Sequence, residues 1–149
     1  MVKKIEVIKF LQEEILSKHR SLTFDYEQLE QSLANETKSS AGDKYETSRE
    51  MIQQEMNKLA EQIQKYDLYS QYLQQIKQQE SKVTISEKAL VETSMGLFFI
   101  GIPLGIIKIE GLSLFCISTS SPIYQAMKGL PQDVSFNWQG KEVKVLQIQ

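Results

Sequence analysis

Two runs of apolar residues at seven-residue spacing, separated by one short break, constrain this chain more than any other feature. The spacing is kept by Ile8, Ile15, Leu22 and Leu29 before the break, and by Ile52, Leu59, Tyr66 and Leu73 after it. Apolar residues repeated in this way form a stripe on one side of a helix, which must be buried against another helix. No proline precedes Pro103, and Gly42 is the only glycine before Gly96. The pattern therefore predicts two long helices, over about residues 5–38 and 45–79.

The break favours a hairpin of the two helices within one chain over a coiled coil between two chains. Its sequence, Ser39-Ser40-Ala41-Gly42, is small and polar and suits a reversal of chain direction. Asp43 and Glu46 follow it at the spacing of a helix cap, with Asp43 as the N-cap and Glu46 at the third helical position. A second interpretation is that both carboxylates project from the tip and share a divalent cation such as Mg²⁺. Two carboxylates cannot complete a metal site, so that role needs a second macromolecule.

Three basic residues, Lys38, Lys44 and Arg49, surround these carboxylates. One interpretation is that they are solvated charges on the helix surfaces. The other is that they hold phosphate groups when the tip approaches the end of a nucleic acid.

After about residue 81 the pattern changes to short apolar runs separated by turn sequences. We expect strands over residues 89–93, 97–102, 106–109, 112–118, 134–138 and 141–148. Ser121 is predicted to cap a short helix that Pro122 begins and Gly129 ends. We therefore predict an α+β protein with a helical hairpin in residues 1–80 and an antiparallel sheet with one short helix in residues 81–149. The segment Ser120-Ser121-Pro122-Ile123 is either simply the start of that helix or an exposed docking loop for a partner.

Composition excludes several functions. The net charge of −2 has no basic excess in either half, which argues against sequence-specific DNA binding. Charges interrupt the first residues, and no apolar run is long enough for a signal peptide or a membrane span. The one cysteine, Cys116, lies in an apolar run and fits a reducing, cytoplasmic compartment. His19 has no metal-ligand partner at a recognisable spacing, and no catalytic triad or phosphate-binding loop is present, so we expect no cofactor bound by the chain alone.

Two separated segments resemble the Gre family of bacterial transcript-cleavage factors (GreA/GreB type). Gly42-Asp43-Lys44-Tyr45-Glu46 is similar to the acidic Gly-Asp-x-x-Glu motif at the family's coiled-coil tip. Ile117-Ser118-Thr119-Ser120-Ser121-Pro122 is similar to the family's Ile-Ser-x-x-Ser-Pro stretch, and a short helix, a glycine and a final hairpin follow it in both. The order and spacing of these segments agree over nearly the whole chain.

The resemblance implies a transcription elongation factor that inserts its coiled coil into the secondary channel of RNA polymerase. Asp43 and Glu46 would help to hold a Mg²⁺ ion in the polymerase active centre, where backtracked RNA is cut, and the nascent RNA 3′ end would be contacted only indirectly. An FKBP-like C-terminal domain would dock at the channel entrance through Ser121-Pro122. The protein would then be an accessory factor rather than an enzyme, with Mg²⁺ bound only in the complex.

The chain departs from the family pattern in two places. Glu46 is followed by Thr47-Ser48-Arg49, where the family usually has Asn-Ala, and Ser120 occupies the position of the acidic residue before Ser-Pro. Two alternatives therefore stay open: a Gre-like regulator that occupies the channel without stimulating cleavage, and a coiled-coil adaptor unrelated to polymerase. Both tip carboxylates are retained, which favours cleavage over regulation alone.

Overall fold

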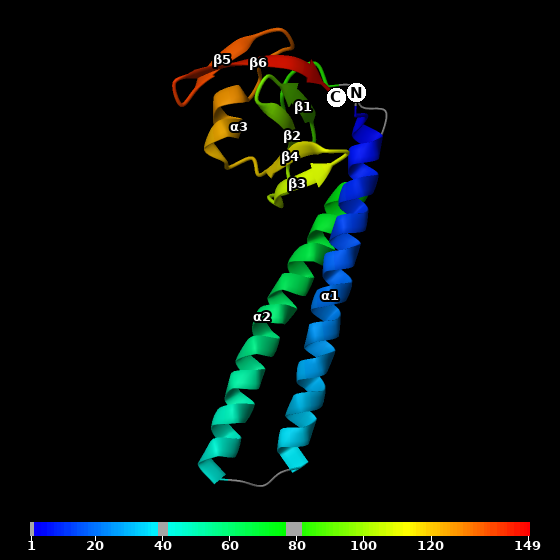
Figure 1. The fold of residues 1–149 in the computed structure, drawn as a ribbon, viewed down its shortest axis with the longest axis vertical. Helices are drawn as coiled ribbons and strands as arrows, with labels where there is room; N and C mark the ends of the chain where they lie inside the picture. Colours follow the sequence, from blue (N-terminus) through cyan, green and yellow to red (C-terminus); the bar gives the residue numbers. More distant parts are fainter. Residues whose placement is uncertain (1, 39–41, 77–81) are drawn as a thin grey trace. The chain divides into compact units, whose positions relative to one another are not determined.

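The computed structural model describes residues 2–38, 42–76 and 82–149, with residues 36–38 and 42–45 described by their backbone alone (Figure 1). Two long helices come first, α1 (Lys4–Lys38) and α2 (Gly42–Gln74), and six strands with one short helix follow. Residue contacts divide the chain into two compact units. One is Leu11–Gln75, and the other joins Met1–Phe10 to Ile76–Gln149. The start of α1 therefore packs with the sheet, whereas the sequence-based division at residue 80 placed it with the helices.

Within the helical unit, α1 and α2 run in opposite directions, as the heptad spacing predicts (Figure 1). The helix bounds differ from the prediction at one place. Because α2 already begins at Gly42, Asp43 lies inside its first turn, and the predicted N-cap position of Asp43 is wrong. The predicted turn at residues 39–41 lies outside the described residues.

The apolar stripes of the two helices are only partly buried. The buried members are Ile8, Leu11, Ile15, Leu22, Met56 and Leu73. Other members of the stripes, including Leu29, Leu59 and Ile63, are half-buried. This is expected of two helices alone, because each can cover only the side of the other that faces it.

One polar contact joins the middle of α1 to α2. His19 Nε2 lies 2.8 Å from Asp67 Oδ1, and the two side chains are 30% and 55% exposed. Ile15, one turn before His19, and Tyr66, next to Asp67, line a small hollow beside the same pair. The pair fixes which residues of the two helices face each other at this level.

We expect His19→Ala to lower the free energy of unfolding of the hairpin by about 0.2–1 kcal/mol, because solvent screens a pair this exposed. Thermal unfolding followed by helical circular dichroism would measure the change, with Asp67→Asn and the double variant completing a mutant cycle. If the effects of the two single variants simply add, His19 and Asp67 do not interact in solution.

The second unit is a six-stranded sheet with the order β3-β4-β2-β1-β6-β5. Its strands are β1 (Leu90–Thr93), β2 (Gly96–Ile100), β3 (Gly105–Ile109), β4 (Leu112–Ile117), β5 (Ser135–Trp138) and β6 (Lys141–Ile148). All six lie close to the predicted runs, and the predicted α+β class is confirmed. One pairing differs from the predicted antiparallel sheet, because β2 and β4 pair in parallel. After β2, residues 101–104 lead to β3 at the edge, and β4 returns between β3 and β2. β2 and β3 are therefore not neighbours, although they follow each other in the sequence.

Helix α3 (Pro122–Met127) covers one face of this sheet and supplies Tyr124 and Met127 to the core. The buried cluster around them consists of Ile85, Ala89, Val91, Phe98, Ile100 and Val145. Phe98 stacks on Phe115 of the neighbouring strand, with ring centroids 5.0 Å apart. Cys116 is buried in β4, where loss of solvation raises the pKa of its thiol to about 12. The thiol is therefore protonated and unreactive at neutral pH.

Hydrogen bonds attach the start of α1 to the end of the chain. The Lys4 amide donates to Gln149 Oε1 at 2.9 Å, and Gln149 Nε2 donates to the Val2 carbonyl at 3.1 Å. The Lys3 amide donates to Glu6 Oε2 at 3.0 Å, which is one half of a capping box. These bonds satisfy backbone groups that the first turn of a helix leaves free. Neither long helix, over its described residues, is apolar enough along its length to cross a membrane.

Candidate functional site

The first candidate site is the end of the hairpin, where only three residues separate the end of α1 at Lys38 from the start of α2 at Gly42. Asp43 occupies the first turn of α2, and Glu46 follows three residues later. Positions three residues apart on a helix lie on the same face, one turn above the other. The backbone thus places both predicted carboxylate positions on one side of α2, within its first two turns. The Glu46 side chain is exposed.

The local field at this end suits acidic groups. The start of a helix carries a partial positive charge from its free N–H groups, which stabilises nearby carboxylates. Of the three predicted basic residues, Arg49 has an exposed side chain one turn beyond Glu46. Lys38 is the last residue of α1 and Lys44 lies in the first turn of α2, and their side chains lie outside the described ones. Their role as phosphate contacts stays a prediction.

Carboxylate oxygens are the donors that Mg²⁺ prefers, so the chemistry of Asp43 and Glu46 fits this ion. Within the described residues, no group of three or more His, Cys, Asp or Glu side chains is placed to hold a metal. Two carboxylates would therefore supply only part of a coordination shell, and further ligands would have to come from a partner.

The second candidate site is the loop Ser120–Ile123, which leads into α3. Ser121 is the N-cap, with extended backbone angles (φ −68°, ψ 142°), and its hydroxyl accepts a hydrogen bond from the Tyr124 amide at 3.4 Å. Pro122 takes the first helical position. The helix start predicted from the sequence is confirmed. Ser120 and Pro122 are exposed, whereas Ile123 packs partly against the core.

Hydrogen bonds hold this loop in one conformation. The hydroxyls of Ser118 and Ser120 lie 2.9 Å apart, and Gln125 Nε2 donates to the Thr119 carbonyl at 2.7 Å. The Ser121 amide donates to the Ser118 carbonyl at 3.2 Å. A loop that is already ordered loses little entropy when a partner binds it, so this geometry is compatible with docking. The docking role itself stays a prediction.

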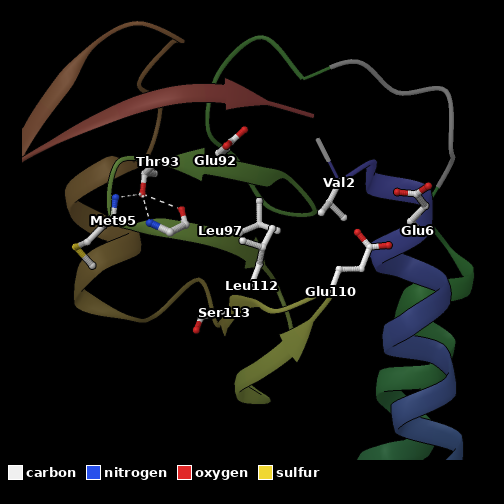
Figure 2. Close-up of a pocket in the computed structure, with 10 residues that line it drawn as sticks. Val2, Glu6, Glu92, Thr93, Met95, Leu97, Glu110, Leu112 and Ser113 are labelled. Carbon is white, nitrogen blue, oxygen red and sulfur yellow. Dashed lines mark hydrogen bonds between the residues drawn. The ribbon is translucent and has the colours of Figure 1, made fainter.

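A pocket in the sheet unit was not foreseen from the sequence. It has a volume of about 560 Å³ and is lined by the first residues of the chain, by the ends of β1, β2 and β4, and by the turns β1–β2 and β3–β4 (Figure 2). Three glutamates, Glu6, Glu92 and Glu110, are among its lining residues. They are far apart in the sequence and follow no motif spacing, so no local signal could have identified them as one site.

Comparisons with known proteins give a distant structural likeness only. No family model matches the chain, and no curated protein matches it. A solved structure described as that of the transcription factor Gfh1 is similar at 16% sequence identity and a TM-score of 0.37, with 92% of each chain covered. A crystal structure of Thermus aquaticus Gfh1 is similar at 18% identity and a TM-score of 0.33, with 87% of this chain and 92% of that chain covered. A function for the chain therefore has to be argued from its own residues.

Proposed function

We propose that this chain is a Gre-like transcription factor that places the tip of its helical hairpin in the secondary channel of RNA polymerase and stimulates cleavage of backtracked RNA. The observation that carries the proposal is the placement of Asp43 and Glu46 on one side of α2, immediately after a three-residue connection between two long helices. Such a hairpin is narrow enough to bring two carboxylates to a place that a globular surface cannot reach. The resemblance of residues 42–46 and 117–122 to the Gre motifs suggests that this place is the secondary channel of RNA polymerase.

The residues of the tip would act by adding charge and oxygen ligands to the polymerase active centre. A Mg²⁺ ion bound there would activate water and stabilise the charge that develops on the phosphate. Asp43 and Glu46 would each contribute a carboxylate oxygen, and the partial positive charge at the start of α2 favours negative groups at this end of the helix. The chain would supply part of the site and the polymerase the rest, so the factor is not an enzyme by itself.

A second candidate function is regulation of the polymerase without cleavage. The residues after Glu46 favour it, because the segment Thr47-Ser48-Arg49 departs from the family pattern. Arg49 also puts an exposed positive charge one turn beyond the Glu46 carboxylate. A cation there would partly offset the negative charge that the tip brings.

One experiment separates the two functions. The purified chain is added with Mg²⁺ to stalled, backtracked elongation complexes, and the length of the RNA is followed on a gel. Shortened RNA supports the cleavage factor. Intact RNA at every Mg²⁺ concentration, together with slower nucleotide addition, supports the regulator. If the chain neither cleaves, slows addition nor binds the polymerase, both proposals are wrong and the adaptor alternative remains.

The docking loop gives a prediction of its own. Ser120→Ala combined with Pro122→Ala removes the two exposed groups but keeps Ser121 as the cap, so we expect α3 to stay folded. Removal of such contacts from an interface costs about 1–2 kcal/mol, so polymerase binding should weaken about tenfold. A pull-down titration would measure this, with exposed Lys141→Ala on the β5–β6 hairpin as the control.

A second variant, Ser121→Ala with Pro122→Gly, should also weaken binding. It removes the cap as well, which costs about 1 kcal/mol of stability. A cooperative thermal transition must therefore be shown for that variant. Unchanged polymerase affinity of the Ser120/Pro122 variant would remove the loop from the interface.

A further inference from the structure

The pocket of about 560 Å³ lies at one end of the sheet, beside the turn between β1 and β2 and the turn between β3 and β4. Thr93 ends β1 and Gly96 begins β2, while Leu112 begins β4 after the turn that follows β3. Val2, from the segment before α1, closes one side, and every lining residue belongs to the same compact unit (Figure 2). The pocket is thus a feature of the sheet unit alone.

The pocket is distinct from the Ser120–Ile123 loop. Leu112 and Ser113, which line the pocket, are the first two residues of β4. The loop follows Ile117, the last residue of the same strand. The two features therefore lie at opposite ends of β4, and a partner could engage both.

The walls of the pocket combine apolar surface with carboxylates. Val2 and Leu97 are buried beside it, whereas Met95 and Leu112 are 39% and 51% exposed. Apolar side chains exposed at the mouth of a pocket favour a ligand that brings apolar surface of its own.

The charge of the pocket has one sign. Among the described residues that line it, Glu6, Glu92 and Glu110 are charged, and none is Lys, Arg or His. The Lys3 amide uses one oxygen of Glu6. Among the described residues, neither the Glu92 nor the Glu110 side chain has a hydrogen bond or ion pair, so both carboxylates can accept bonds from a ligand.

The two hydroxyl groups of the pocket already have hydrogen-bond partners. The Ser113 hydroxyl accepts a hydrogen bond from Lys108 Nζ at 2.7 Å. The Thr93 hydroxyl accepts hydrogen bonds from the amides of Met95 and Gly96 at 3.1 and 3.2 Å and donates to the Gly96 carbonyl at 2.9 Å, as the dashed lines of Figure 2 show. Its hydrogen-bonding capacity is used within the turn. Recognition of a ligand therefore falls to the carboxylates and the apolar walls.

We infer that this pocket binds an arginine side chain of a basic segment of a protein partner. The side chain would lay its aliphatic stem on Leu97 and Leu112 and direct its guanidinium group to Glu92 and Glu110. A guanidinium group suits the site better than an ammonium group, because it is planar, weakly hydrated and carries five N–H donors that can serve more than one carboxylate. The inference concerns a second contact surface and does not depend on the proposed cleavage function.

The test uses the full chain labelled with ¹⁵N and the probe N-acetyl-arginine N-methylamide. We expect saturable shifts of the amide signals of Thr93, Met95, Gly96 and Ser113, with a dissociation constant on the order of millimolar. The neutral isostere N-acetyl-citrulline N-methylamide has the same shape without the charge. It should bind about fivefold more weakly, since each charge-assisted bond contributes on the order of 1 kcal/mol at a partly exposed site.

Two variants test the carboxylates. Glu92→Gln with Glu110→Gln should weaken binding of the arginine probe about fivefold, whereas Glu142→Gln, an exposed position on β6 outside the pocket, should leave it unchanged. Glu110 has a positive φ of 49°, which asparagine tolerates well, so Glu110→Asn is a second variant that preserves the turn. It should weaken binding about threefold on its own.

Three outcomes would overturn the inference. They are the absence of saturable shifts, equal binding of the citrulline probe, and equal loss of affinity in Glu142→Gln and in the pocket variants. The last result would mean that the probe responds to overall charge rather than to the pocket.

Discussion

RNA polymerase supplemented with the double variant Asp43→Asn, Glu46→Gln should cut backtracked RNA about 100-fold more slowly than polymerase supplemented with the parent chain, while the variant still binds the polymerase. The estimate follows from the several kcal/mol that a metal ion contributes to a hydrolytic transition state, of which every 1.4 kcal/mol is a tenfold change in rate. Both substitutions keep the size of the side chain and remove its charge. The effect on rate should therefore exceed any effect on stability.

The structure makes this variant a fair test of the tip. Asp43 lies within the first turn of α2, so its replacement does not remove an N-cap. Loss of a carboxylate from the first turn costs about 0.3–1 kcal/mol through the helix dipole, which is small beside the expected effect on cleavage. Glu46 is exposed, so Gln leaves the packing of the hairpin unchanged.

Cleavage would be measured on backtracked complexes over a range of Mg²⁺ concentrations, and binding by competition of the double variant with the parent. Glu50→Gln is the matched control, because Glu50 is another exposed carboxylate on α2, one turn beyond Glu46. Equal cleavage by parent and double variant would show that the two carboxylates serve only the helix. Equal loss in Glu50→Gln would show that total negative charge, rather than position, is what matters.

Gly96→Ala should lower the free energy of unfolding of the sheet unit by about 2–4 kcal/mol, the largest effect we expect from a single substitution on stability. Gly96 has a φ of 145°, a conformation that side chains with a Cβ rarely adopt. An added Cβ would also lie 2.8 Å from Cε2 of Phe115. That ring stacks on Phe98, which is buried, so it cannot move away without disturbing the core.

Gly111→Ala is the control that separates strain from the clash. Gly111 has a φ of 79°, and no heavy atom lies within 4 Å of the position of its added Cβ. Its substitution should cost only about 1–2 kcal/mol, from backbone strain alone. Urea unfolding followed by the fluorescence of Trp138, the only tryptophan of the chain, would report on the sheet unit. Equal losses in the two variants would mean that Phe115 yields to the added methyl group.

Much of the local structure follows from the sequence alone. The seven-residue spacing predicts α1 and α2 because a helix places such residues on one side, whatever the rest of the chain does. Ser121, Pro122 and Gly129 mark α3 through the needs of the helix ends, and the cap geometry of Ser121 agrees. Gln139 and Gly140, with φ of 51° and 79°, form the tight turn predicted between the last two strands.

The tertiary structure decided which of these elements are neighbours. The parallel pairing of β2 with β4 depends on the path of residues 101–104, and the apolar pattern of a strand does not state which strand lies beside it. Attachment of the first residues of α1 to Gln149 joins the two ends of the sequence. In the same way, only the fold brings Glu6, Glu92 and Glu110 to one pocket. The periodicity of a sequence predicts single helices and strands, whereas the position of these glutamates depends on the order of the strands in the sheet.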